Sequence, residues 1–178
     1  MVGRKNLSVM LLDGLQFGQP RAGAAYLLEA EKTALVDTGT AASAPHLLEA
    51  LRGRHLDFVL VTHAHLDHAG GAGHIARAHP EATFFAHPRA VPHLLDPTRL
   101  VAAVSQASPE LARLYGLPVP IPRSRLVAAE GGEVLELGSE TRLVVLATPG
   151  HASHHICAFE PSTATLFLGD AAGHHGVA

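Results

Sequence analysis

The chain has 178 residues, of which 47% are hydrophobic and 16% charged, a balance typical of one globular domain with a sizeable core. Its net charge is −3 and it has no cluster of Lys and Arg, which argues against a nucleic-acid partner because such partners need a basic surface. The longest apolar runs have the length of strands, so we expect no membrane span and no membrane partner.

Residues 1–6 carry some positive charge, but no continuous apolar segment of a signal peptide accompanies them. We therefore expect a cytoplasmic protein. The single cysteine, Cys157, lies in an apolar stretch and is interpreted as a small buried hydrophobic residue. The fourteen histidines are the unusual feature, because histidine is the commonest side chain for binding metals.

Apolar alternation and turn residues predict nine strands in one domain that spans residues 1–178. In chain order these strands cover residues 7–12, 25–29, 32–36, 57–62, 82–86, 133–137, 142–147, 156–159 and 165–168. Helices are predicted over residues 43–53, with Ser43 as the N-cap, and over 74–78, 91–95 and 109–114. Strands alternate with helices in the first half and follow one another in the second, which predicts two stacked sheets with helices outside.

Residues 88–124 are rich in proline and show no strand periodicity. An insertion of this kind often carries function, so we expect it to line a substrate pocket, with a purely structural role as the alternative.

Four potential metal ligands follow the apolar strand over residues 57–62: His63, His65, Asp67 and His68. The His-x-His spacing lets two imidazoles point the same way, and the next two ligands can then face a neighbouring ion. Gly70 and Gly71 would allow a tight backbone path. Imidazole and carboxylate ligands suit zinc, and also iron or manganese.

Two later strands also end in a candidate ligand. His151 follows the strand over residues 142–147, and Asp170 follows the strand over 165–168. Ligands delivered from the ends of rigid strands favour one shared site. Six ligands exceed the need of one tetrahedral ion, so we expect two metals.

The combined motif resembles the metallo-β-lactamase superfamily. It consists of Thr62-His63-x-His65-x-Asp67-His68-x-Gly70-Gly71, then Thr148-Pro149-Gly150-His151, then Phe167-Leu168-Gly169-Asp170. The resemblance implies an α/β (α+β) fold, an αββα sandwich of two mixed sheets with helices outside. It further implies that His63, His65 and His151 hold a first zinc-type ion, that Asp67 and His68 hold a second, and that Asp170 bridges them.

The sequence departs from this family in one respect. The family has a final histidine ligand on a late strand, whereas this sequence ends eight residues after Asp170. We therefore expect either a domain truncated at its C-terminus or an incomplete second metal site. His174 and His175 are alternative ligands for that site, with a surface loop as the competing interpretation.

Two further features need an interpretation. Asp37-Thr38-Gly39 also occurs in aspartic proteases, but that assignment leaves the histidines unexplained, so we expect Asp37 to be a buried residue that orders the metal ligands. His154 and His155 follow His151 closely, and either one of them reaches the site or both face solvent.

The resemblance implies a metallohydrolase similar to glyoxalase II, with a metal-bound hydroxide attacking an ester, thioester or lactone carbonyl of a small molecule. Asp67 and Asp170 would then be the catalytic carboxylates, and a homo-oligomer is compatible with this role. One alternative is an oxidoreductase resembling persulfide dioxygenases, with one iron held by His63, His151 and Asp170. Another alternative is a non-catalytic fragment or metal-binding module.

Overall fold

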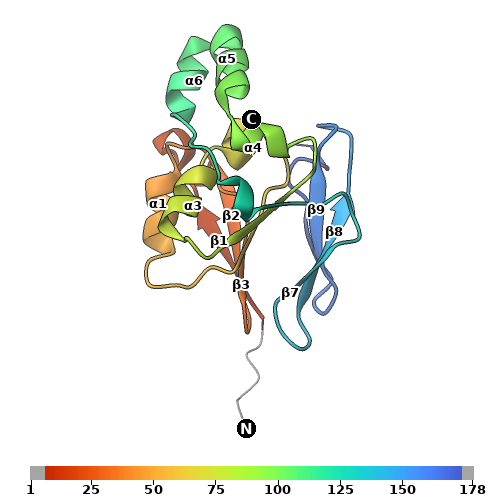
Figure 1. The fold of residues 1–178 in the computed structure, drawn as a ribbon. Helices are drawn as coiled ribbons and strands as arrows, with labels where there is room; N and C mark the ends of the chain where they lie inside the picture. Colours follow the sequence, from red (N-terminus) through yellow and green to blue (C-terminus); the bar gives the residue numbers. More distant parts are fainter. Residues whose placement is uncertain (1–6, 174–178) are drawn as a thin grey trace.

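The computed structural model describes residues 7–173 and contains two stacked β-sheets (Figure 1). The first sheet has the order β1-β2-β3-β4-β5-β6. Its strands are β1 (Ser8–Asp13), β2 (Ala24–Glu29), β3 (Thr33–Val36), β4 (Phe58–Leu60), β5 (Thr83–Ala86) and β6 (Leu126–Ala128). β1, β2 and β3 pair antiparallel, whereas β3, β4, β5 and β6 pair in parallel.

The second sheet has the order β10-β9-β8-β7, and its described strand pairs are all antiparallel. Its strands are β7 (Val134–Glu136), β8 (Arg142–Ala147), β9 (Ile156–Glu160) and β10 (Thr165–Phe167). The first sheet is thus mixed, as expected, while this sheet is antiparallel because short turns join its consecutive strands.

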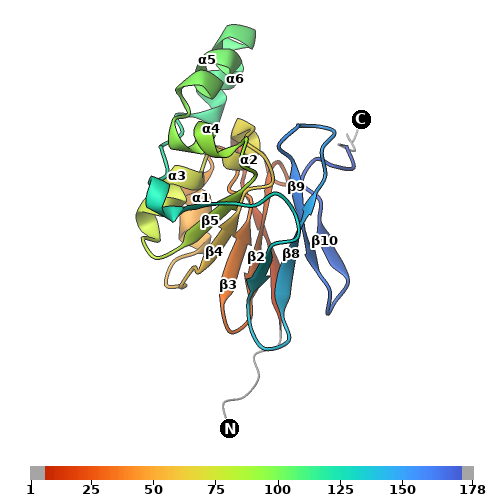
Figure 2. The same ribbon diagram turned by 45° about the vertical axis from the view of Figure 1, so that its right-hand side comes forward.

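Helices pack on the side of the first sheet that faces away from the second (Figure 2). The α-helices are α1 (Ala44–Ala50), α2 (Leu66–Ala69), α3 (Ala72–Ala78), α4 (Val91–Leu95), α5 (Thr98–Ala107) and α6 (Pro109–Tyr115). The described residues also form two 3-10 helices, η1 (Gln16–Gly18) and η2 (Arg123–Arg125). No helix within residues 7–173 is both long and apolar enough to cross a membrane.

Strand alternation divides the core into two layers. Leu35 and Val59 pack with Leu47 and Ile75 of α1 and α3, between the first sheet and its helices. The neighbouring residues along the same strands, such as Leu60, point the other way and pack against the second sheet. Successive side chains of a strand alternate between faces, so one sheet supplies both layers.

The structure confirms the nine predicted strands and the two stacked sheets, and within residues 7–173 the helices cover the first sheet and not the second. Five elements were not predicted: α2, α5, β6 and the two 3-10 helices η1 and η2. Ser43 occupies the N-cap position of α1, as predicted, but its side chain makes no capping hydrogen bond. Ser43 precedes α1 but has helical backbone angles, and its hydroxyl pairs with Thr40 Oγ1 at 2.8 Å instead of with the helix backbone.

Candidate metal centre

The histidine cluster begins where β4 ends, at one edge of the first sheet. Thr62 and His63 follow the strand and are fully buried. His65 has extended backbone angles and stands at the N-terminus of α2, which carries Asp67 and His68. This short helix turns His68 back toward the strand end, because residues three apart on a helix lie on one face.

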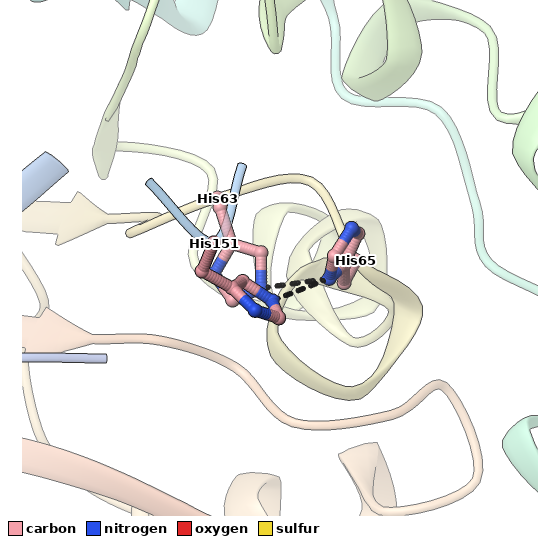
Figure 3. A group of neighbouring side chains, drawn as sticks. All are labelled: His63, His65 and His151. Carbon is pink, nitrogen blue, oxygen red and sulfur yellow. Dashed lines mark hydrogen bonds between the residues drawn. The ribbon is translucent and has the colours of Figure 1, made fainter. Parts of the chain in front are cut away.

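Three histidines bring their ring nitrogens together (Figure 3). His65 Nδ1 lies 3.1 Å from His63 Nε2 and 3.0 Å from His151 Nε2. His151 reaches this group from the loop after β8, in the other sheet. The first predicted set of ligands is therefore assembled from both sheets.

A second group shares His63 and adds His68 and Asp170. His68 Nε2 lies 3.2 Å from Asp170 Oδ1, while Asp170 Oδ2 lies 3.3 Å from His151 Nε2 and 4.0 Å from His63 Nε2. The Asp170 carboxylate thus stands between the two groups, as a bridging ligand would.

Asp37 is buried behind these ligands. One carboxylate oxygen accepts hydrogen bonds from the Thr62 amide at 2.8 Å and from its hydroxyl at 2.9 Å. The other oxygen lies 2.8 Å from His68 Nδ1. Because a carboxylate only accepts, Nδ1 of His68 carries a proton, and Nε2 is the ring nitrogen that faces Asp170.

Thr62 orients His63 in the same manner. Its hydroxyl donates to Asp37 and lies 3.1 Å from His63 Nδ1, so its oxygen accepts a hydrogen bond from the protonated Nδ1. His63 Nε2 is then the free nitrogen, directed at His65. The sequence motif contains Thr62, but its hydrogen-bonding role follows only from the fold.

Burial and neighbouring charges set the protonation of the histidines. Burial lowers the pKa of His63 and of His65, and the surrounding imidazoles lower that of His63 further. Burial also opposes charge on His68, but the charge and hydrogen bond of Asp37 outweigh it and raise the pKa of His68 to about 9. Neutral His63 and His65 are suited to metal binding, which requires unprotonated imidazole.

Asp67 belongs to neither group of three converging ligand atoms. It lies in the first turn of α2, close enough that its charge offsets part of the lowering of the His65 pKa and contributes to the raised pKa values of His68 and Tyr115. The structure places it beside the cluster, and its role as a ligand stays a prediction.

His154 and His155 have different surroundings. His155 is buried and its Nε2 lies 3.1 Å from the backbone nitrogen of Asp170. His154 Nε2 is buried without a hydrogen-bonding partner among the described residues, and burial with nearby imidazoles lowers the pKa of His154 to about 4. The sequence left open which of the two would reach the site, and the fold selects His155. His174 and His175 lie outside the described residues.

Gly70 and Gly71 permit close packing, not an unusual backbone conformation. A Cβ at Gly70 would lie 2.3 Å from the Leu66 carbonyl oxygen and 2.8 Å from the Ala41 amide nitrogen. A Cβ at Gly71 would lie 2.3 Å from the Thr38 carbonyl oxygen. The ligand-bearing segment therefore sits directly on the loop that carries Asp37.

The proline-rich insertion borders the cluster through α4. The His93 ring lies 6.3 Å from the His154 ring. His93 and Leu94 line a small cavity together with Ala64 and Leu66, which lie between the candidate ligands His63 and Asp67. By contrast, α5 and α6 pack on each other and extend away from the sheets (Figure 1). A larger cavity of about 330 Å³ opens between Glu136, Arg142 and Ser162, at the other end of the second sheet.

The arrangement can bind one or two divalent ions. Four imidazoles and a carboxylate converge from three strand ends, and two of the imidazoles have their outer nitrogen held by a buried partner. Such outer hydrogen bonds fix the ring orientation of metal-binding histidines in proteins.

A family model described as the metallo-beta-lactamase superfamily matches residues 18–177. A metallo-beta-lactamase fold-containing protein of Sulfurisphaera tokodaii is 28% identical over 159 residues, which are 86% of this chain and 58% of that protein. A hydroxyacylglutathione hydrolase of Acidiphilium cryptum is 32% identical over 140 residues, which are 79% of this chain and 42% of that enzyme.

Solved structures give the same result. An archaeal metallo-beta-lactamase superfamily protein from Sulfolobus tokodaii matches with a TM-score of 0.72 and 24% identity, over 88% of this chain and 60% of that one. A subclass B3 metallo-beta-lactamase from a soil metagenome library matches with a TM-score of 0.63 and 26% identity, over 86% and 54%. The chain spans between 42% and 60% of the length of the relatives and solved structures that it matches here. With its fold, its clustered candidate ligands and a family match over nearly all of its residues, the chain belongs to the metallo-beta-lactamase superfamily.

Proposed function

We propose that this protein is a metal-dependent hydrolase that holds two zinc-type ions and cleaves an ester, thioester or lactone of a small molecule. The observation that carries this proposal is the pair of ligand groups that share His63 and meet at Asp170. The similarity to a hydroxyacylglutathione hydrolase at 32% identity supports a thioester as the substrate class.

The residues fit a zinc-type ion. Zinc–nitrogen bonds of about 2.0–2.1 Å in a tetrahedral site separate the ligand atoms by about 3.3 Å. His65 Nδ1 lies 3.1 Å from His63 Nε2 and 3.0 Å from His151 Nε2, and Asp170 Oδ2 lies 3.3 Å from His151 Nε2. His63, His65 and His151 would hold the first ion, Asp67 and His68 the second, and Asp170 both.

The bound ions would polarise the substrate carbonyl and lower the pKa of water to about 7. The protein's own residues have the remaining tasks. Asp170 and Asp67 supply carboxylates that can accept a proton beside the ligands. Asp37 and Thr62 fix the ring orientation of His68 and His63, and α4 borders the site on the side of His93.

The test compares wild-type protein with His63→Ala and Asp170→Ala. We expect wild-type protein to contain about two zinc equivalents by elemental analysis and to hydrolyse a hydroxyacylglutathione thioester, a lactone or an aryl ester. Both variants should keep the circular dichroism of the wild type and lose turnover, because His63 belongs to both groups and Asp170 stands between them. Full turnover in either variant would disprove the site assignment, and wild-type protein that binds no metal would favour a non-catalytic module.

One observation favours a second candidate, a mononuclear iron oxidoreductase. His63 Nε2 and His151 Nε2 lie 4.0 and 3.3 Å from the same oxygen of Asp170, Oδ2. Two imidazoles and one carboxylate are the ligand set of non-haem iron oxygenases. One iron per chain, with oxygen consumption on glutathione persulfide and no hydrolysis, would establish this function in place of the hydrolase.

A further inference from the structure

The main chain at Asp170 is held from behind by His155. The Asp170 amide nitrogen lies 3.1 Å from His155 Nε2, and the preceding Gly169 has a φ of +51°. A Cβ at Gly169 would lie 2.8 Å from both His155 Nε2 and Thr62 Oγ1. The backbone that presents Asp170 therefore packs directly against the His155 ring.

The bond from the Asp170 amide to His155 fixes the donor and acceptor of the hydrogen bonds that follow it. A backbone amide can only donate, so His155 Nε2 is the acceptor and the ring proton is on Nδ1. Nδ1 lies 2.8 Å from Thr148 Oγ1, which must accept a hydrogen bond from the Nδ1 proton. The Thr148 hydroxyl is then free to donate to Cys157 Sγ at 3.2 Å, and the thiol donates to the Leu168 carbonyl oxygen at 3.3 Å.

This chain of bonds is closed and involves three strands. It starts at Asp170, after β10, passes through His155 and Thr148 in the loop between β8 and β9, and returns through Cys157 of β9 to Leu168, two residues before Asp170. The direction of each of its four hydrogen bonds is fixed by its neighbour, so the imidazole of His155 can have only one tautomer. Main-chain bonds from Thr148 to His155 and from Ile156 to Thr62 fix the same loop to β4.

We infer that His155 is a positioning residue, which acts as the Nδ1-protonated neutral tautomer and holds Asp170 in place through its main-chain amide, with Thr148 and Cys157 fixing that tautomer. The inference rests on the proposed function for the role of Asp170 as a metal ligand. It assigns to Thr148 and Cys157 a part in the site, although neither is a ligand.

The tautomer is tested on metal-free wild-type protein. Two-bond proton–nitrogen spectra distinguish a protonated ring nitrogen from an unprotonated one, and we expect protonated Nδ1 and unprotonated Nε2 at His155. We also expect slow hydrogen exchange at the Asp170 amide, because the bond to His155 protects it. A ring protonated at Nε2, or a rapidly exchanging Asp170 amide, would overturn the inference.

Two matched variants separate positioning from general damage. In His155→Gln the side-chain amide reaches the former position of Nε2 and can still accept from Asp170, whereas in His155→Asn it reaches only that of Nδ1. We expect the Asp170 amide of His155→Asn to lose its protection from hydrogen exchange, and this variant to bind zinc about 10–100-fold more weakly. His155→Gln should retain most of the exchange protection and most of the zinc affinity of the wild type. His46→Asn, on the exposed face of α1, is the control and should behave as the wild type.

Variants at Thr148 keep the inference testable if a substitution of buried His155 prevents folding. Thr148→Val removes the acceptor for Nδ1 and should reduce both protection and zinc affinity, while Thr148→Ser should restore them. Equal zinc affinity and equal Asp170 exchange in all folded variants would overturn the inference. If wild-type protein binds no zinc, the proposed function fails, and the tautomer and amide exchange still decide whether His155 holds Asp170.

Discussion

Asp37 connects two segments that lie far apart in the sequence. Its carboxylate receives three hydrogen bonds, from the Thr62 amide and hydroxyl and from the His68 ring, across sequence separations of 25 and 31 residues. Asp37 itself has a φ of 62°, which is unusual for a residue other than glycine. A strained backbone at a buried carboxylate indicates that the surrounding bonds hold it there.

Asp37→Asn should weaken metal binding more than it weakens the fold. Asparagine has nearly the same shape but presents one oxygen and one amide group, so it cannot accept from both Thr62 and His68 as the carboxylate does. We expect zinc affinity to fall about 10–100-fold, as it does when an outer partner of a ligating histidine is lost. A competition titration with a chelator measures this, and an unchanged affinity would remove Asp37 from the site.

Glu160 is the second buried carboxylate of this kind, although it lies away from the ligands. It is fully buried, and it accepts hydrogen bonds from the backbone and hydroxyl groups of Ser162 and Thr163. Burial opposes its charge, but these four bonds outweigh burial and lower the pKa of Glu160 below its usual value of 4.5.

Glu160→Gln should destabilise the protein in a pH-dependent manner. Because the folded state lowers the pKa, the carboxylate contributes stability above about pH 4.5, and this contribution is lost as pH falls through the lowered value. We expect a loss of about 1.5–3 kcal/mol in unfolding free energy at pH 7, and little difference near pH 3. Urea denaturation at both values measures it. Glu136→Gln, at an exposed position of β7, is the control, and a pH-independent loss would contradict the prediction.

At the scale of elements, the turn after β10 depends on Gly169. Its positive φ and the close approach of His155 and Thr62 leave no room for a side chain. Gly53, at the end of α1, also has a positive φ, of 73°, but an added Cβ there would meet no atom within 4 Å. An alanine at Gly53 would introduce backbone strain alone, whereas an alanine at Gly169 would introduce backbone strain and steric contact.

Gly169→Ala should cost more stability than Gly53→Ala. Both variants introduce the backbone strain of about 1–3 kcal/mol that left-handed conformations impose on residues with a side chain. Only Gly169→Ala also displaces the segment that carries Asp170, so it should lower zinc affinity as well. Thermal unfolding and a zinc titration of both variants provide the comparison. Equal effects of the two on zinc affinity would show that the contact with His155 is unimportant.

At the scale of the whole molecule, the candidate ligands join the two sheets. His63, His65 and His68 follow β4 of the first sheet, whereas His151 and Asp170 follow β8 and β10 of the second. The core layer between the sheets holds them by apolar packing, and bound metal would add a cross-link at this edge.

Removing metal should therefore lower the thermal stability of the protein. A ligand present at about 100 times its dissociation constant stabilises the folded state by about 2.7 kcal/mol. For a chain of this size, we expect chelation to lower Tm by roughly 5–10 °C. His63→Ala is the control and should show no response to the chelator. A Tm of wild-type protein that is the same with and without chelator would contradict the prediction.

The sequence by itself determined the features that depend on near neighbours. Apolar alternation located the nine strands, and the spacing of His63, His65 and His68 after a buried strand indicated a metal site. β6 has one buried residue followed by two exposed ones, so it shows no alternation between faces, and α5 has no buried residue. The sequence therefore contains no strong signal for either element.

Only the tertiary structure decided which side chains stand behind the ligands. The bond from Asp37 to His68 and the bond from His155 to Asp170 join residues 31 and 15 positions apart. Such contacts depend on the order of strands in a sheet and on how the two sheets stack. The structure also distinguished buried His155, bonded to Asp170, from its neighbour His154. In the sequence the two are adjacent histidines, and the direction of each side chain is set by the packing of the loop between two strands and not by its local pattern.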